Sequence, residues 1–135
     1  IAEDYVIATG ITTTVRDFVR MAFEELGVTI EFSGKGELEK GVIIDFDEEL
    51  LAKLDIPVSA IKLGQTVVKV DPQYYRPTEV DLLIGNPEKA NTQLGWKPKY
   101  TLSSLVKEMV ENDLKQTRKE EYLRKGGFDV LNYFE

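Results

Sequence analysis

The chain has 135 residues, which is enough for one compact domain with a buried core but too few for a nucleotide-binding domain and a separate substrate domain. Its 17 basic and 24 acidic residues give a formal charge of -7, which disfavours long-range attraction to nucleic acid or to an anionic membrane. Local donors must therefore bind any anionic ligand.

The chain contains no cysteine and no histidine, which excludes disulfides and thiolate metal sites and removes the commonest general base and metal ligand. No apolar run approaches the roughly 18 residues that a membrane helix needs, and no signal segment opens the chain. We therefore predict a soluble protein, compatible with a reducing, cytoplasmic setting, that has no metal site and no nucleic-acid or membrane partner. Because the chain begins at Ile1 without a methionine, we expect a piece processed or excised from something longer.

The first quarter of the chain predicts a strand, a helix and a second strand. The apolar run from Tyr5 to Gly10 indicates a buried strand. Thr14 is a suitable N-cap for a helix that apolar residues continue until Gly27. Val28 to Phe32 indicates another strand, which makes a β-α-β unit the natural arrangement. The start of this helix could bind an anion through its free N–H groups, but an ordinary capped helix explains the same residues.

The middle of the chain, residues 34–66, has the weakest pattern. Gly34 to Gly41 has glycines at a spacing that resembles a phosphate loop, but no Gly-Lys-Ser/Thr ending follows, so we predict a flexible loop. Val42 to Phe46 is compatible with a short strand. Asp47 begins a short helical pattern, which Pro57 closes.

A β-branched run from Thr66 to Val70 predicts a strand that leads into a turn carrying Arg76 and Glu79. A guanidinium can bind phosphate oxygens through two parallel hydrogen bonds, and a carboxylate can accept from sugar hydroxyls. These two residues are therefore candidate ligands for a phosphorylated sugar. Pro77 pushes the backbone of Arg76 toward an extended conformation. The residues alone leave open the alternative that Arg76 and Glu79 form an ordinary surface ion pair.

The last third of the chain predicts two helices. Asn86 is the predicted N-cap of a short helix, with Pro87 at its first position, that Gly95 ends, and we expect Trp96 to pack against its end. Thr101 caps the longest helix, which we expect to run to Lys125. The apolar stripe of this helix comprises Leu102, Leu105, Val106, Met109, Val110 and Leu114. The apolar tail after the helix is expected to pack on the domain or on a partner.

Five motifs occur in order along the chain: Asp4-Tyr5-Val6-Ile7-Ala8-Thr9-Gly10, Thr14-Val15-Arg16-Asp17-Phe18, Val70-Asp71-Pro72-Gln73-Tyr74-Tyr75-Arg76-Pro77-Thr78-Glu79-Val80-Asp81, Gly85-Asn86-Pro87-Glu88-Lys89-Ala90 and Leu94-Gly95-Trp96-Lys97-Pro98. Together they resemble the C-terminal part of GDP-mannose 4,6-dehydratases, which belong to the extended short-chain dehydrogenase/reductase superfamily. The resemblance covers Glu3 to about Lys119 and is weakest between Lys35 and Thr66. The Val-Asp-Pro-x-Tyr-Tyr and Ala-Thr-Gly strings point to the GDP-mannose branch.

The resemblance implies a division of labour. In such enzymes an N-terminal Rossmann domain holds NADP and carries the catalytic residues, while the C-terminal part binds the sugar nucleotide. By this likeness Arg76 contacts the pyrophosphate of GDP or GDP-mannose and Glu79 contacts the ribose hydroxyls. Residues 1–135 would then be one sugar-nucleotide-binding domain of the mixed α/β class, without the complete Rossmann domain. The parent enzyme would be a homo-oligomer, and the edge of the opening strand would be exposed in this chain alone.

The sequence lacks the catalytic signatures of that superfamily, because it has no Gly-x-x-Gly-x-x-Gly turn and no Tyr-x-x-x-Lys pair. The family's chemistry needs a bound nicotinamide and that pair, so we expect no catalytic residue, no bound cofactor and no activity in this chain alone. Two hypotheses remain. The chain is the substrate-binding part of an NADP-dependent GDP-mannose 4,6-dehydratase, a lyase, or it is a free-standing, non-catalytic binding or interaction module of the same fold.

Overall fold

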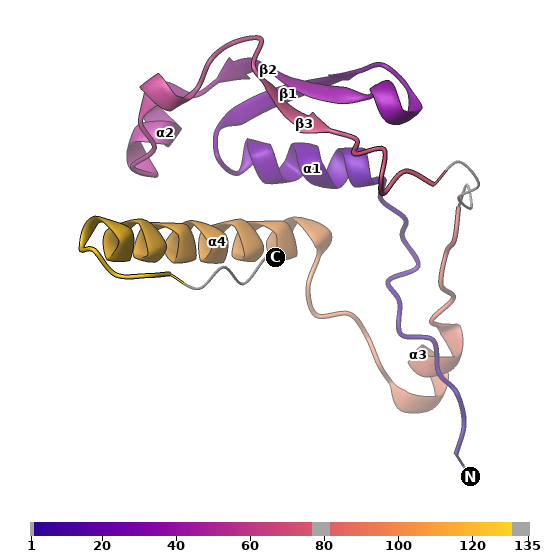
Figure 1. Ribbon diagram of the computed structural model, residues 1–135. Coiled ribbons are helices and arrows are strands. Elements are labelled where there is room, and N and C mark those ends of the chain that lie inside the picture. Colours follow the sequence, from indigo (N-terminus) through magenta and orange to yellow (C-terminus); the bar gives the residue numbers. More distant parts are fainter. Residues whose placement is uncertain (1, 77–81, 131–135) are drawn as a thin grey trace.

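The computed structural model describes residues 2–76 and 82–130 and has the mixed α/β character expected from the sequence (Figure 1). Two short 3-10 turns, η1 (Gly36–Leu38) and η2 (Val58–Ala60), lie in connections. The helices and strands, in chain order, are α1 (Val15–Glu24), β1 (Val28–Ser33), β2 (Lys40–Phe46), α2 (Glu48–Lys53), β3 (Thr66–Lys69), α3 (Glu88–Leu94) and α4 (Leu102–Lys125).

The three strands form one antiparallel sheet in the order β1-β2-β3. Lys40 stands at the junction, because it lies opposite Ser33 of β1 and opposite Lys69 of β3. The predicted β-α-β unit is wrong, since β1 pairs with the strand that follows it through a short hairpin and no described strand precedes α1. The buried core of the sheet region consists of Val28, Ile30, Ile43 and Leu51.

Helix α1 covers one face of the sheet and lies between the sheet and α4 (Figure 1). Val19 and Phe23 pack against the core, as their helical spacing predicts. The predicted N-cap is confirmed, because the Thr14 hydroxyl oxygen accepts the N–H of Asp17 at 3.0 Å. The helix is thereby fixed at its start by a side chain and along its length by apolar contact.

The predicted strand from Tyr5 to Gly10 is wrong, because the segment has no ladder partner in the described parts of the chain. It runs beside the segment that leads into α3 instead (Figure 1): a Cβ on Gly85 would lie 2.6 Å from the Cβ of Ala8, and the Thr12 hydroxyl donates to the carbonyl of Leu83 over 3.4 Å. An apolar run alone cannot make a strand, since a strand also needs a neighbour for its backbone groups. The exposed apolar side chains of this region are Val6, Ile7 and Ile11.

The connection between β1 and β2 is shorter than the flexible loop predicted from Gly34 to Gly41. The η1 turn occupies its centre, and Gly41 already belongs to β2. Gly34 has φ +87°, and a Cβ there would lie 2.3 Å from the carbonyl oxygen of Leu38. Because that oxygen belongs to the backbone, only glycine fits at this position.

Three further predictions in the middle of the chain are confirmed. The strand predicted from Val42 to Phe46 is β2, and the strand predicted from Thr66 to Val70 is β3. The helix predicted to begin at Asp47 is α2, whose first turn is capped by the Asp47 carboxylate, which accepts the N–H of Leu50 at 2.9 Å. The helical pattern after Asp47 therefore identified this short helix correctly, and the structure adds the cap.

The short predicted helix before Trp96 is confirmed as α3. The Asn86 side-chain oxygen accepts the N–H of Glu88 at 2.9 Å, although Pro87 stands just before the helix rather than inside it. Gly95 ends the helix with φ +64°, and the N–H of Trp96 returns to the carbonyl oxygen of an earlier helical residue, as expected for a helix that ends at glycine.

The long predicted helix is α4, and its start at Thr101 and its end at Lys125 are both confirmed. Thr101 and Ser104 form a reciprocal capping box, with side-chain to backbone distances of 3.2 and 3.0 Å. Beyond the helix, the N–H of Phe128 donates to the carbonyl of Leu123, and residues 131–135 of the predicted packed tail lie outside the described residues. No described helix combines the length and apolar character that crossing a membrane requires.

Only part of the apolar stripe predicted for α4 faces the domain. Val106 is 1% exposed, whereas Met109 is 45% exposed and Leu105 is also exposed. The helix packs on α1, and Arg118 near its far end donates to the carbonyl oxygen of Leu54 at the end of α2. Helix α4 therefore packs through a narrow line of side chains, and the hydrogen bond from Arg118 to Leu54 fixes its C-terminal half.

Candidate functional site

Strand β3 leads the chain directly into the turn that carries Arg76. The last ladder pair joins Lys69 to Lys40, and the next N–H, that of Val70, donates to the carbonyl oxygen of Glu39 at 3.3 Å. This bond extends the β2–β3 pairing by one step beyond the strand. The turn therefore leaves the sheet from a fixed point.

The turn itself is closed by two backbone hydrogen bonds and one side chain. The N–H of Tyr74 donates to the carbonyl of Asp71 at 3.0 Å, and the N–H of Tyr75 donates to the carbonyl of Pro72 at 3.4 Å. The Asp71 carboxylate accepts the N–H of Gln73 at 2.9 Å, an Asx-type contact that favours this geometry. Arg76 follows immediately and is exposed, so its guanidinium is accessible to a ligand.

The second predicted ligand, Glu79, lies outside the described residues. Its position relative to Arg76, and the ion pair that the sequence left open, therefore stay predictions. The structure does show that the chain reaches Arg76 through a hydrogen-bonded turn at the end of a sheet. A guanidinium on such a turn can bind two phosphate oxygens side by side.

The two tyrosines before Arg76 have different surroundings. Tyr74 is 77% exposed, while Tyr75 is 38% exposed and rests against the β1–β2 connection. A Cβ built on Gly36 would lie 3.1 Å from the hydroxyl oxygen of Tyr75 and 3.5 Å from its Cζ. Because Gly36 has no side chain, the Tyr75 side chain can lie close to the backbone there.

A second arginine, Arg16, contacts the same connection through Glu39. Its Nε and Nη2 atoms lie 2.7 and 2.5 Å from one carboxylate oxygen of Glu39. Its guanidinium also stands 5.7 Å from the centre of the Phe32 ring, with that of Arg20 at 5.4 Å. Arg16 is thus engaged by a carboxylate and an aromatic ring and acts as an anchor for the connection.

The first turn of α1 is organised by an acidic residue rather than left open to an anion. The Thr14 hydroxyl donates to the Asp17 carboxylate at 2.6 Å, and Arg20 lies 3.1 Å from the same carboxylate. The hydrogen bond from Thr14, followed by the contact with Arg20, lowers the pKa of Asp17 below its ordinary value of 3.8. This arrangement supports the reading of an ordinary capped helix.

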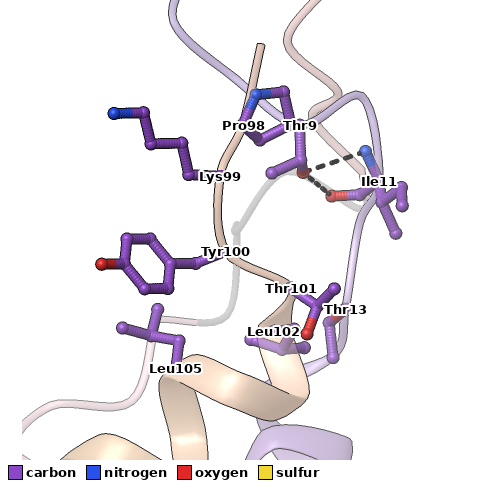
Figure 2. A pocket seen from close by; sticks show the side chains of 9 residues that line it. All are labelled: Thr9, Ile11, Thr13, Pro98, Lys99, Tyr100, Thr101, Leu102 and Leu105. Atoms are coloured by element: carbon purple, nitrogen blue, oxygen red, sulfur yellow. Dashed lines mark hydrogen bonds between the residues drawn. The ribbon is translucent and has the colours of Figure 1, made fainter.

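A separate hollow of about 470 Å³ lies between the N-terminal segment and the start of α4 (Figure 2). On one side of the hollow the Thr9 hydroxyl oxygen lies 3.3 Å from both the backbone nitrogen and the carbonyl oxygen of Ile11. The side chains of Lys99 and Tyr100 project away from Thr9 in this view. The hollow contains no acid–base pair, so it offers surface rather than chemistry. Its lining residues are Thr9, Ile11, Thr13, Pro98, Lys99, Tyr100, Thr101, Leu102 and Leu105.

Two residues of the turn's surroundings, Gly36 and Glu39, were not identified from the sequence. The glycine spacing around residue 34 suggested only a loop, yet the same spacing marks where the backbone of one segment approaches another. The pairing of Glu39 with Arg16 joins residues 23 positions apart. No local pattern in the sequence indicates such a contact.

The chain thus has a mixed α/β fold that presents an exposed arginine beyond the end of a small antiparallel sheet. The sequence model of one family, described as GDP-mannose 4,6 dehydratase, matches residues 1–109. The chain belongs to this family. The expectation drawn from the five sequence motifs is thus confirmed at the level of the family.

The sequence is similar to GDP-mannose 4,6-dehydratases of several organisms over nearly its whole length. It is 45% identical over 128 residues to a GDP-mannose 4,6-dehydratase of Yersinia enterocolitica, an alignment that covers 95% of the chain. It is 43% identical over the same length to that of Vibrio cholerae and 42% identical over 124 residues to that of Dictyostelium discoideum, with 95% and 92% of the chain covered. The chain spans about a third of the length of these relatives, 32% for the first two and 28% for the third.

Proposed function

We propose that this chain is the sugar-nucleotide-binding part of a GDP-mannose 4,6-dehydratase, an enzyme that converts GDP-mannose to GDP-4-keto-6-deoxymannose with loss of water. Membership of the family and the names of the relatives support this proposal. The observation that carries it is the exposed Arg76 on a hydrogen-bonded turn at the end of β3. In this proposal Arg76 binds the pyrophosphate and Glu79 binds the ribose hydroxyls of the nucleotide.

The chemistry of the reaction belongs to groups that this chain does not contain. The superfamily resemblance assigns hydride transfer to NADP in a Rossmann domain, together with a Tyr-x-x-x-Lys pair, and the chain has no such pair. We therefore assign binding and orientation of GDP-mannose to this chain, and oxidation, loss of water and re-reduction to the enzyme as a whole. The whole enzyme would be an NADP-dependent lyase, homo-oligomeric and cytoplasmic.

Calorimetric titration of the 135-residue chain with GDP tests the assignment of Arg76. We expect weak but measurable binding, because part of the pocket would come from outside this chain. Hydrogen bonds to charged groups contribute about 1.5–3 kcal/mol, so Arg76→Ala should weaken binding by about 10- to 150-fold. The matched control is Arg124→Ala on α4, whose side chain is also exposed and whose loss should leave affinity unchanged. Equal affinities of wild type and Arg76→Ala would refute the assignment.

The alternative is a free-standing, non-catalytic binding or interaction module of the same fold, and the absence of a Tyr-x-x-x-Lys pair from residues 1–135 agrees with both functions. Both functions predict binding of GDP, so affinity cannot separate them. Formation of a 4-keto sugar nucleotide from GDP-mannose can, measured in extracts that contain the protein as its own cells make it. Product that disappears when the gene is deleted supports the dehydratase, and binding with no such product supports the module.

A further inference from the structure

We infer that Tyr75 is a positioning residue, which holds Arg76 in place by resting on the connection between β1 and β2. The inference rests on the proposed role of Arg76 as a phosphate ligand and adds a residue to that site. Tyr75 directly precedes Arg76, so the backbone of one fixes where the other begins. Its role is to restrict the arginine before the ligand arrives.

Tyr75 lies close to Gly36, whereas its neighbour Tyr74 is exposed. Gly36 has φ +57°, and its missing Cβ would meet the Tyr75 hydroxyl oxygen at 3.1 Å. The side chain of Tyr74 is 77% exposed, twice the exposed fraction of Tyr75, which is 38%. The turn therefore places one aromatic ring on the protein and leaves the other in solvent.

The surface beneath Tyr75 is itself held in place from both sides. The Glu39 carboxylate binds Arg16 of α1, and the Glu39 carbonyl oxygen accepts the N–H of Val70 at the start of the turn. The Glu39 side chain is only 20% exposed, which strengthens its pairing relative to an open surface bridge. Helix α1, the connection and the turn thus form one continuous set of contacts that leads to Arg76.

A restrained arginine binds more tightly than a free one, because less conformational entropy is lost when the ligand orders it. The turn is anchored before its tip by the Val70 bond and after its tip by the Tyr75 ring. Removing the ring leaves the first anchor and releases the second. Removal of the Tyr75 ring should therefore weaken ligand binding, while the core of the sheet, which other residues form, remains folded.

The test is a titration of GDP into the 135-residue chain carrying single and double substitutions. Tyr75→Ala should weaken binding about tenfold, and Tyr75→Phe should restore part of it, because phenylalanine keeps the ring beside Gly36 and loses only the hydroxyl oxygen, the atom nearest to that residue. Tyr74→Ala is the matched control and should leave affinity unchanged. In an Arg76→Ala background, Tyr75→Ala should have no further effect, since it acts through Arg76.

Two results of the titration would overturn the inference. Tyr75 is a direct ligand if Tyr75→Ala still weakens binding in the Arg76→Ala background. It has no special role if Tyr74→Ala and Tyr75→Ala weaken binding equally. Amide hydrogen exchange gives a readout that needs no ligand: Tyr75→Ala should speed exchange at residues 73–76 and leave β1 and β2 unchanged. If wild type fails to bind GDP, the proposed function fails, while unchanged exchange in Tyr75→Ala rejects the positioning role separately.

Discussion

Replacing Val106 by alanine should measure how much the docking of α4 contributes to stability. Val106 is 1% exposed, and the substitution removes two buried methyl groups, worth about 1.6 kcal/mol at roughly 0.8 kcal/mol each. The cavity left behind adds about 1 kcal/mol if the site does not collapse. Alanine favours helix over valine by about 0.5 kcal/mol, which offsets part of the loss. The expected cost is about 2 kcal/mol.

Urea denaturation followed by circular dichroism measures this cost, and Met109→Ala is its control. Met109 belongs to the same predicted stripe but is 45% exposed, so its loss should cost less than about 1 kcal/mol. A cost of 2 kcal/mol corresponds to a midpoint about 1 M lower in urea when the slope is about 2 kcal/mol/M. Equal costs at the two positions would refute the placement of Val106 on the docked face and of Met109 outside it.

The remaining predictions concern a turn and a helix cap. Gly34→Ala should destabilise the protein by at least about 2 kcal/mol in the same assay, because it adds a backbone clash with Leu38 to the strain of positive φ. Gly64 has φ +78° and open space around it, so Gly64→Ala should lower stability only by the backbone strain, about 1 kcal/mol. Equal losses of stability in Gly34→Ala and Gly64→Ala would reject the clash with Leu38. Folding lowers the pKa of Asp17, so the ionised side chain stabilises the folded protein. This stabilisation is complete above the pKa of the unfolded chain, 3.8, and is lost as the pH falls through the lower pKa of the folded protein. The stability difference between wild type and Asp17→Asn should therefore shrink below about pH 4, and a constant difference down to pH 2 would contradict the assignment.

Local chemistry in the sequence predicted the helices and their ends well. Thr14 and Thr101 were identified as caps, and each hydroxyl accepts the N–H three residues on. Asp47 was predicted only as the start of a helical pattern, and the structure shows that its carboxylate caps the helix in the same way. The exposed side of α4 was not predictable from helical spacing, because Met109 and Val106 satisfy the same apolar pattern. Which of them is buried depends on where α1 lies, and that is a tertiary property.

Strand pairing was less predictable than strand composition. The run from Tyr5 to Gly10 has the residues of a strand, but the described chain offers no neighbour to complete its hydrogen bonds. The candidate site shows the same limit. Arg76 is a candidate from the sequence because its chemistry is local, and its role stays a prediction. The contacts of the turn with Gly36 and Glu39 come from a distant hairpin and are visible only in the folded chain.

The hairpin between β1 and β2 has a consequence for protein engineering. Surface hairpins usually tolerate insertions, since their length is set only by the need to connect two strands. Here the Gly34 backbone abuts Leu38, the Gly36 surface carries Tyr75, and Glu39 reaches α1. An added residue would shift at least one of these contacts, so an epitope tag or a reporter inserted in this hairpin would also disturb the turn or helix α1.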